Sequence, residues 1–264
     1  MNARNLDFIG RYNQRRFFPL VDDKMKTKLL AQRYRMPVPK LFFTVERQHD
    51  VNDAVEKMQA LSGFAIKPAS GSGGKGIWVI TERRGADFLK PSGVAVTSED
   101  LRRHMSNTLA GLYSLGGKAD EIIVEDLIHR HPMFDGLSHE GVPDLRVIVF
   151  KGYPVMAMLR LATHASEGKA NLHQGAIGVG LAIATGQCTT AVQFNKHVER
   201  HPDTGKSLAG LVVPNWRDIL ELAAGCYEMT RLGYLGTDLV IDRDRGPMLL
   251  ELNARPGLSI QVAN

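Results

Sequence analysis

The sequence predicts a mixed α+β fold, with helices concentrated before residue 118 and strands after it. Apolar residues recur at helical spacing in three segments of the first half. From Glu121 onward, short apolar runs separated by turn residues predominate. The elements do not alternate regularly between strand and helix, which disfavours a parallel Rossmann-type sheet.

The chain opens with an arm, residues 1–21, in which arginines are mixed with aromatic residues and which we expect to pack loosely. A helix follows, with Asp22 or Asp23 as its N-cap, and it ends before Pro37 because proline cannot continue a helix. Lys24 therefore lies in the first turn of this helix.

Periodicity and capping predict the remaining elements of the first half. Thr97 begins a helix, because Asp100 three residues later completes a variant of the capping box. We also expect a helix over about 51–61 and two strands, 64–67 and 77–80, around a glycine-rich loop.

The second half reads as strands connected by tight turns, with one long helix. That helix has a proline in its first turn and a glycine after its last residue, as is typical of helix ends. It is expected over 214–232, and the strands over 121–126, 145–150, 154–162, 175–183, 234–242 and 247–253.

Length and charge limit the possible functions of the protein but do not identify one. The 264 residues allow one large domain or two small lobes. The 33 Lys and Arg exceed the 28 Asp and Glu, which gives a formal charge of +5. This balance suggests an anionic partner, and nucleic acid, a phosphorylated cofactor and an acidic peptide all remain open.

Several protein classes are excluded or disfavoured. No apolar run approaches the ~20 residues of a membrane span, and the N-terminus has no apolar signal region. Two cysteines, Cys188 and Cys226, cannot form a disulfide framework and are not at zinc-ligand spacing. We therefore expect a cytoplasmic protein with no membrane partner.

The glycine-rich loop is the first candidate site. It contains G-x-G-x-x-G, but a strand follows instead of a helix, and no Ser or Thr follows Gly-Lys as Walker A requires. What remains is a flap whose backbone N–H groups can approach a polyphosphate, with Lys67 as a fixed positive charge. The alternative is an ordinary flexible hairpin. The predicted phosphate contacts are Ser70, Gly71, Ser72, Gly73, Gly74 and Lys75.

The last hairpin is the second candidate site. If Asp242 closes against Pro247, Asp238 lies directly opposite Glu251, and Asn253 shares their face. Opposed carboxylates repel, and a bound cation would turn that repulsion into attraction. Two carboxylates and an amide suit Mg²⁺ or Mn²⁺. The alternative is a solvent-facing hairpin, and a register slip of one residue would separate the donors.

A third cluster joins Asp144, Arg146, Arg160 and the polar segment 171–174. Strand alternation places Asp144 and Arg146 on one face, with Arg160 on the next strand. Such a charged group could hold a ribose or a negatively charged intermediate. Each residue alone could equally form a surface ion pair of little energetic value.

Taken in order, these motifs resemble the ATP-grasp superfamily, and most closely the RimK-like α-L-glutamate ligases. The resemblance covers about residues 22–258, and its specificity comes from eight motifs in the right order. They are Asp23-Lys24 with Met36–Pro39, Ile66–Pro68 with the glycine flap, Val124–Ile128, Asp144–Arg146, Arg160, Asn171–Gly175, Asp238 and Glu251–Gly257.

The resemblance implies two lobes that clasp ATP, residues 22–118 and 119–264, without the N-terminal domain that usually precedes them. It implies ATP and Mg²⁺ or Mn²⁺ as cofactors. For the nucleotide, the resemblance implies that Lys24 and Lys67 contact phosphates, that the loop 70–76 covers the triphosphate and that Lys169 to Asn171 lie near phosphate. It also implies that the backbone of Asp126 and Leu127 reads adenine and that Asp144 binds the nucleotide. For the reaction, it implies that Arg160 and Arg255 steady an acyl-phosphate and that Asp238, Glu251 and Asn253 hold the metal.

The implied reaction joins a carboxylate to an amine through an acyl-phosphate, with release of ADP. Lys67, Arg160 and Arg255 are the expected catalytic residues. The expected partners are an amino acid, such as glutamate, and a peptide or amine acceptor; nucleic acid is disfavoured, and a homo-oligomer is left open. The alternatives are an ATP-grasp kinase acting on a small molecule and a nucleotide-binding module without turnover.

Overall fold

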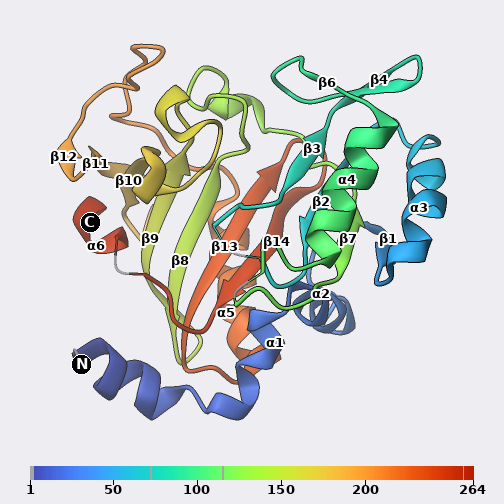
Figure 1. The fold of residues 1–264 in the computed structure, drawn as a ribbon. Coiled ribbons are helices and arrows are strands. Elements are labelled where there is room, and N and C mark those ends of the chain that lie inside the picture. The colour runs from blue at the N-terminus through green and yellow to red at the C-terminus, as the bar shows by residue number, and fades with distance from the viewer. Residues whose placement is uncertain (1–2, 72, 115, 258) are drawn as a thin grey trace. The chain divides into compact units, whose positions relative to one another are not determined.

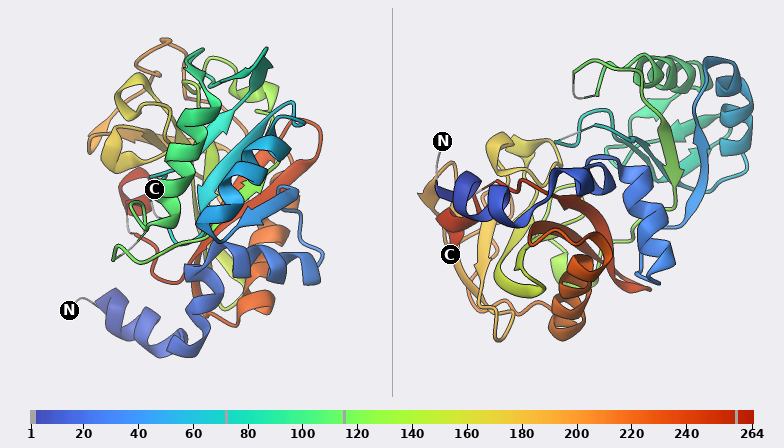
Figure 2. Two further views of the ribbon diagram at one scale, coloured as in Figure 1. Left: turned by 45° about the vertical axis from the view of Figure 1, so that its right-hand side comes forward. Right: turned by 90° about the horizontal axis from the view of Figure 1, so that it is seen from below.

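The chain folds into two compact units, seen from three directions in Figures 1 and 2. The computed structural model describes residues 3–71, 73–114, 116–257 and 259–264. One unit combines Met1–Val38 with Ile128–Asn264, and the other is Pro39–Leu127. These bounds differ from the predicted lobe boundary at residue 118. The first helix belongs with the C-terminal part because the segment after it pairs there, with the Leu249 N–H donating to the Pro37 carbonyl at 2.8 Å.

The unit Pro39–Leu127 contains more strand than the sequence indicated. Its main sheet is antiparallel in the order β1-β7-β2-β3, and β4, β5 and β6 form a small second sheet. The elements are β1 Leu41–Val45, α3 Val51–Met58, β2 Phe64–Pro68, β3 Trp78–Ile80, β4 Glu82–Arg84, β5 Asp87–Leu89, β6 Ala95–Val96, α4 Ser98–Leu109 and β7 Ile122–Glu125. Helical residues still outnumber strand residues before residue 118, and strand residues outnumber helical ones after it, so the predicted distribution is confirmed although strands of the first half were missed.

The two predicted helices of this unit are confirmed, and they supply its core. The apolar stripe of α3, including Val55 and Met58, packs with Met105 of α4 and with Phe64 of β2. At the start of α4, the Thr97 side chain accepts from the Asp100 N–H at 3.1 Å, and the Asp100 carboxylate accepts from the Thr97 N–H at 3.1 Å. The predicted capping box is thus present in full.

The other unit is built on a seven-stranded antiparallel sheet in the order β12-β11-β10-β9-β8-β13-β14. The strands are β8 Asp144–Phe150, β9 Tyr153–Leu161, β10 Ile177–Leu181, β11 Cys188–Gln193, β12 Lys196–His197, β13 Tyr234–Asp242 and β14 Gly246–Asn253. The helices are α1 Pro19–Asp22, α2 Lys24–Arg33, α5 Trp216–Thr230 and α6 Ile260–Ala263. Shorter helical segments of this unit are η1 Arg4–Gly10, η2 Arg15–Phe17, η4 Pro132–Phe134, η5 His164–Ser166 and η6 Leu172–Gln174. The segment η3 Gln48–Asp50 belongs to the unit Pro39–Leu127.

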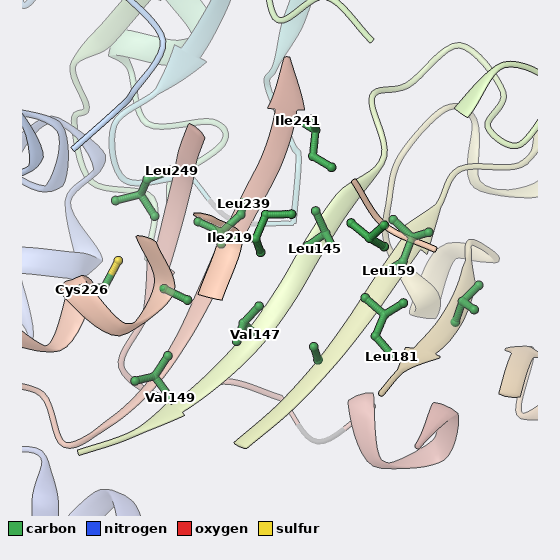
Figure 3. Close-up of a cluster of buried hydrophobic side chains, with 14 of the residues drawn as sticks. Leu145, Val147, Val149, Leu159, Leu181, Ile219, Cys226, Leu239, Ile241 and Leu249 are labelled. Atoms are coloured by element: carbon green, nitrogen blue, oxygen red, sulfur yellow. The ribbon is translucent and has the colours of Figure 1, made fainter. Parts of the chain in front are cut away.

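The two faces of this sheet have different chemistry. On β8, Leu145 and Val147 point into an apolar core against Ile219 and Cys226 of α5 (Figure 3). Because strand residues alternate, the polar Asp144 and Arg146 lie on the opposite face. Farther along the same face, Ile148 and Met158 form a second, smaller apolar cluster with Ile9 and Ile260, so the polar side chains occupy only part of it.

Both cysteines are free and buried. Burial raises the pKa of the Cys188 thiol to about 11 and that of Cys226 to about 12. Both therefore remain protonated thiols at neutral pH and act as small apolar side chains.

The N-terminal arm is tied to the sheet and is not loosely packed. The buried Asn13 amide donates to the carbonyls of Tyr234 and Ala254 at 2.7 and 2.8 Å, and its oxygen accepts from the Tyr234 N–H at 2.8 Å. Across the described residues, the helices are too short or too polar for any of them to traverse a bilayer.

Candidate active site

The β13–β14 hairpin places the predicted metal donors as expected. Asp238 pairs directly with Glu251, and Asn253 pairs with Gly236 two positions along. The turn is one residue tighter than predicted, because Asp242 closes against Gly246 and not against Pro247. A bulge between Asp238 and Leu239 then restores the register. The two differences cancel at the site.

Beside the hairpin lies a buried cluster of two carboxylates and two guanidiniums on three adjacent strands. Arg160 of β9 faces Asp144 of β8, with its Nη2 2.6 Å from Asp144 Oδ2 and 3.0 Å from Asp238 Oδ2. Arg146 faces Asp238 of β13 and donates from both Nε and Nη2, the latter at 2.7 Å. None of the four side chains is more than 14% exposed. We call these four residues the arginine–aspartate ladder; it is buried, so the surface ion-pair alternative is excluded.

The ladder shifts the pKa values of its two aspartates in opposite directions. Burial raises the pKa of Asp144 to about 6, because desolvation and the charge of Asp238 outweigh the single partner Arg160. Burial also acts on Asp238, but Arg146 and Arg160 both bind it and together hold its pKa at about 2. The two carboxylates raise the pKa of Arg160 against the effect of burial. Asp238 is therefore the more firmly ionised carboxylate.

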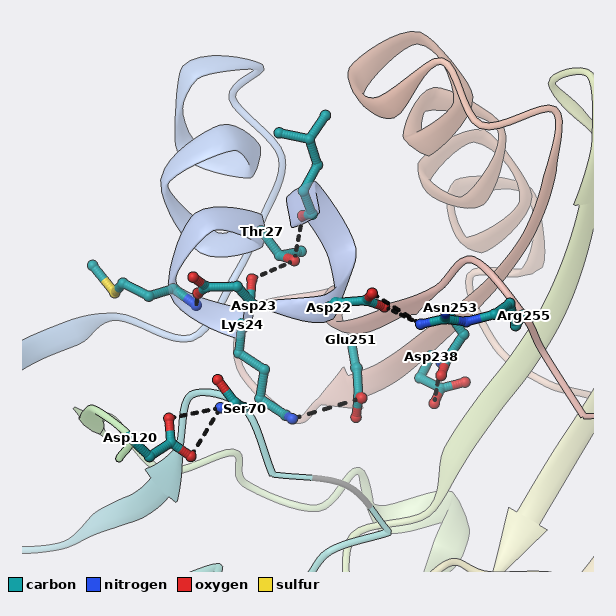
Figure 4. Close-up of polar contacts among 12 residues, drawn as sticks. Asp22, Asp23, Lys24, Thr27, Ser70, Asp120, Asp238, Glu251, Asn253 and Arg255 are labelled. Carbon is teal, nitrogen blue, oxygen red and sulfur yellow. Dashed lines mark hydrogen bonds and ion pairs between the residues drawn. The ribbon is translucent and has the colours of Figure 1, made fainter. Parts of the chain in front are cut away.

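Glu251 is paired with a lysine from the other end of the chain. Lys24 Nζ lies 3.7 Å from Glu251 Oε1 (Figure 4), and Lys24 begins α2 directly after its N-cap. The Asp23 carboxylate caps this helix by accepting from the N–H groups of Met25 and Lys26 at 2.9 and 3.0 Å. The cap predicted at Asp22 or Asp23 is thus Asp23, and it fixes Lys24 beside the hairpin.

The donor set fits a hard divalent cation. Asp238, Glu251 and Asn253 offer oxygen atoms on one face of the hairpin, and the Asn253 amide lies 3.4 Å from Asp238 Oδ2. Among the described residues, no three His, Cys, Asp or Glu side chains are arranged to hold a metal by themselves. A cation here would therefore need further oxygen ligands from phosphate or water. It would also share Asp238 with Arg146, a contact that the sequence did not predict.

Three further predicted site residues of this unit have other partners. Arg255 binds the Asp22 carboxylate at 2.8 and 2.9 Å and lies 4.9 Å over the Phe18 ring. Lys169 Nζ lies 3.1 Å from Glu167, and Asn171 Oδ1 accepts from the His173 N–H at 3.0 Å. Their roles toward phosphate or an acyl-phosphate stay predictions.

The glycine loop in the unit Pro39–Leu127 is fixed at both ends. At the first end, the Asp120 carboxylate accepts from the Ser70 N–H at 3.0 Å and from the Ser114 hydroxyl at 2.5 Å. At the other end, His104 Nε2 lies 3.0 Å from the Gly76 carbonyl. Sequence reasoning missed these anchors, because they come from distant positions in the chain.

The middle of the loop is open for a ligand. Gly73, Gly74 and Gly76 all have positive φ, between 64° and 75°, a backbone conformation that favours glycine. Gly73 and Lys75 are exposed, and a Cβ at Gly74 would meet nothing within 4 Å. Ser72 lies outside the described residues.

Lys67, at the base of the loop, pairs with Glu125 across strands β2 and β7. Their side chains are 12% and 3% exposed. The pair was not predicted, although Glu125 stands next to the expected hinge residues. At the hinge, the Asp126 N–H donates to the Lys40 carbonyl at 2.8 Å, and the Leu127 N–H donates to Asp126 Oδ1 at 2.9 Å. Recognition of adenine by this hinge stays a prediction.

Replacing Lys67 with alanine is expected to weaken binding of a nucleoside triphosphate about tenfold or more, because a charge-assisted contact contributes about 1.5–3 kcal/mol. Isothermal titration calorimetry with a non-hydrolysable ATP analogue measures the affinity. Lys67→Ala also removes the ion pair of the buried Glu125 carboxylate, so the double variant Lys67→Ala/Glu125→Gln, which removes that charge as well, separates lost folding from lost binding. Unchanged affinity in the double variant would refute the phosphate role of Lys67.

Comparison with known proteins supports the fold. The D-cycloserine synthetase DcsG is 16% identical with a TM-score of 0.55, covering 99% of this chain and 74% of that chain. D-alanyl-alanine synthetase A from Vibrio cholerae is 11% identical with a TM-score of 0.53, covering 90% of this chain and 56% of that chain. D-alanine–D-alanine ligase from Bacillus anthracis is 13% identical with a TM-score of 0.50, covering 92% and 59%. The chain thus spans less than two thirds of the length of the last two.

None of the curated proteins compared with the chain matches it. The family described as sugar-transfer associated ATP-grasp matches residues 3–264, which is nearly the whole chain. The predicted α+β class and the ATP-grasp fold are confirmed by the antiparallel sheets and by these structural likenesses. The chain belongs to the sugar-transfer associated ATP-grasp family.

Proposed function

We propose that the protein is an ATP-dependent carboxylate–amine ligase that forms an amide bond and releases ADP and phosphate. The observation that carries the proposal is the hairpin face on which Asp238 and Glu251 are directly opposed, with Asn253 alongside and Lys24 3.7 Å from Glu251. This arrangement offers a place for Mg²⁺ or Mn²⁺ together with ATP phosphates. The nearby ladder supplies guanidinium groups suited to acyl-phosphate chemistry.

The proposed reaction has two steps. A substrate carboxylate oxygen attacks the γ-phosphorus of ATP, and the bond to the bridging oxygen of ADP breaks. A substrate amine then attacks the acyl carbon, loses a proton and expels phosphate. The substrates we propose are an amino acid, with glutamate as the first candidate from the RimK-like resemblance, and a peptide or other amine acceptor.

The chain's own residues would act mainly by charge and position. Asp238, Glu251 and Asn253 would hold the metal ion, which would supply positive charge for the transferring phosphoryl group. Lys24 and Lys67 add fixed positive charge for the phosphates. Asp144 and Asp238 already fix the Arg160 guanidinium. Little free energy is therefore needed to orient it toward a developing oxyanion.

Incubation with ATP, Mg²⁺, glutamate and hydroxylamine tests this proposal. We expect an acyl-hydroxamate, detected by mass spectrometry, together with an equal amount of ADP. Other amino acids in place of glutamate define the carboxylate substrate, and a reaction without amino acid is the control. A stable phosphorylated product would instead identify a kinase, and ATP binding without ADP release under all acid and amine mixtures would identify a module without turnover.

A further inference from the structure

A stack of four side chains lies beside the glycine loop, within the unit Pro39–Leu127. The Trp78 ring of β3 stacks on the His104 ring of α4, with centroids 4.0 Å apart and planes at 9°. Lys90 Nζ lies 3.8 Å from the centroid of Trp78. The Tyr113 ring is tilted by 40° to the His104 ring, with centroids 5.4 Å apart. Contacts with these two rings, one from β3 and one from the segment after α4, restrict the orientation of the imidazole.

This stack contacts the end of the loop at one residue. His104 Nε2 lies 3.0 Å from the Gly76 carbonyl oxygen. A Cβ at Gly76 would lie 2.5 Å from Cγ of Tyr113, and the residue has a φ of +74°. Position 76 therefore requires glycine for both space and backbone conformation.

The protonation state of His104 makes it a donor. The residue is 3% exposed, and burial, aided by the charge of Lys90, outweighs the contact with the Gly76 carbonyl and lowers its pKa to about 4. The ring is therefore neutral at pH 7. A carbonyl oxygen only accepts, so the single ring proton lies on Nε2 and points at Gly76.

The other end of the loop is fixed by Asp120, which accepts from Ser70 and Ser114. The exposed Gly73 and Lys75 lie between these two anchors. A loop held only at Ser70 would have to be ordered when a polyphosphate binds, at a cost in conformational entropy.

We propose that His104 is a positioning residue that presets the glycine loop for a nucleoside triphosphate by holding the Gly76 carbonyl. The proposal rests on the phosphate-binding role of the loop in the proposed function. His104 itself touches the loop backbone, so its effect reaches the ligand through the preset conformation of Gly73–Gly76.

Two substitutions separate the hydrogen bond from the stack. His104→Phe retains a flat ring against Trp78 but removes the donor, whereas His104→Gln retains an N–H donor in a side chain of similar reach. Asn107→Ala, on the exposed side of α4, is the matched control. All three variants are first compared with the wild type by thermal unfolding.

Hydrogen exchange of the peptide spanning residues 69–77 and calorimetric binding of a non-hydrolysable ATP analogue are the readouts. We expect His104→Phe to speed exchange in this peptide and to weaken binding about 3- to 10-fold, the range for one hydrogen bond. The KM for ATP should rise while the KM for the carboxylate substrate stays unchanged. His104→Gln should recover most of the affinity, and Asn107→Ala should match the wild type.

Unchanged loop exchange in His104→Phe would overturn the proposal, as would equal losses in the Phe and Gln variants, which would indicate packing alone. If the wild type itself fails to bind the ATP analogue, the proposed function fails. Hydrogen exchange still decides in that case whether His104 holds the loop.

Discussion

Replacing Glu251 with glutamine should lower the rate of ADP formation about 100-fold or more. Glutamine keeps the size of the side chain but removes the charge that opposes Asp238 across β13 and β14. A cation in such a site contributes several kcal/mol to stabilising the transferring phosphoryl group, and about 2.7 kcal/mol corresponds to 100-fold in rate. The loss should appear mainly in kcat.

Metal affinity should fall in parallel with activity. We expect Glu251→Gln to weaken Mn²⁺ binding at least about tenfold, measured by electron paramagnetic resonance titration with a saturating ATP analogue. Folding should be little affected, because removing this charge relieves the repulsion between the two carboxylates. The glutamine amide oxygen can still accept a hydrogen bond from Lys24.

Asp244→Asn is the matched control for Glu251→Gln. Asp244 lies in the turn of the same hairpin and pairs with Arg243 at the surface, 3.2 Å away. It should retain full activity and full Mn²⁺ affinity. If ADP production persists in Glu251→Gln, the assignment of the metal site to this hairpin is wrong.

The hairpin also shows how far sequence reasoning can reach. Alternation predicted that Asp238, Glu251 and Asn253 share a face, and the structure confirms it. The predicted turn was one residue too long, and the bulge beside Leu239 compensates. Because a one-residue slip would turn a whole strand over, burial of the apolar face selects the bulged register.

What the sequence could not give is the partner of each charged side chain. Asp144 and Arg160 were grouped correctly, but the pairing of Arg146 with Asp238 and of Lys67 with Glu125 was not predicted. Local pattern specifies the face of a strand, whereas a partner depends on which strands become neighbours. The antiparallel order β9-β8-β13-β14 brings the ladder together from segments up to about a hundred residues apart.

Short strands and unit boundaries were missed for a related reason. Strands β4 to β6 have two or three residues each, too few to show a period of two. The segment Met1–Val38 joins Ile128–Asn264 through long-range contacts, such as those of Asn13 with β13. The composition of a segment does not predict such long-range contacts.

Replacing Arg160 with leucine should cost about 3–5 kcal/mol of unfolding free energy, because it leaves a buried negative charge without its partner. Arg160 is 13% exposed and binds both Asp144 and Asp238. Only Arg146 then remains against two carboxylates. Urea denaturation followed by circular dichroism measures the loss.

The double variant Asp144→Leu/Arg160→Leu should regain most of this stability, because the ladder becomes neutral again and gains apolar contacts. The proposed ligase activity should be lost in both variants, since the guanidinium proposed to steady the acyl-phosphate is absent from each. Stability and activity would thus separate, and a double-mutant cycle would give the coupling between the two residues. Arg217→Leu, which breaks an exposed ion pair with Glu221 on α5, is the control and should change stability little. A double variant no more stable than Arg160→Leu alone would show that the ladder stabilises the sheet by packing and not by charge balance.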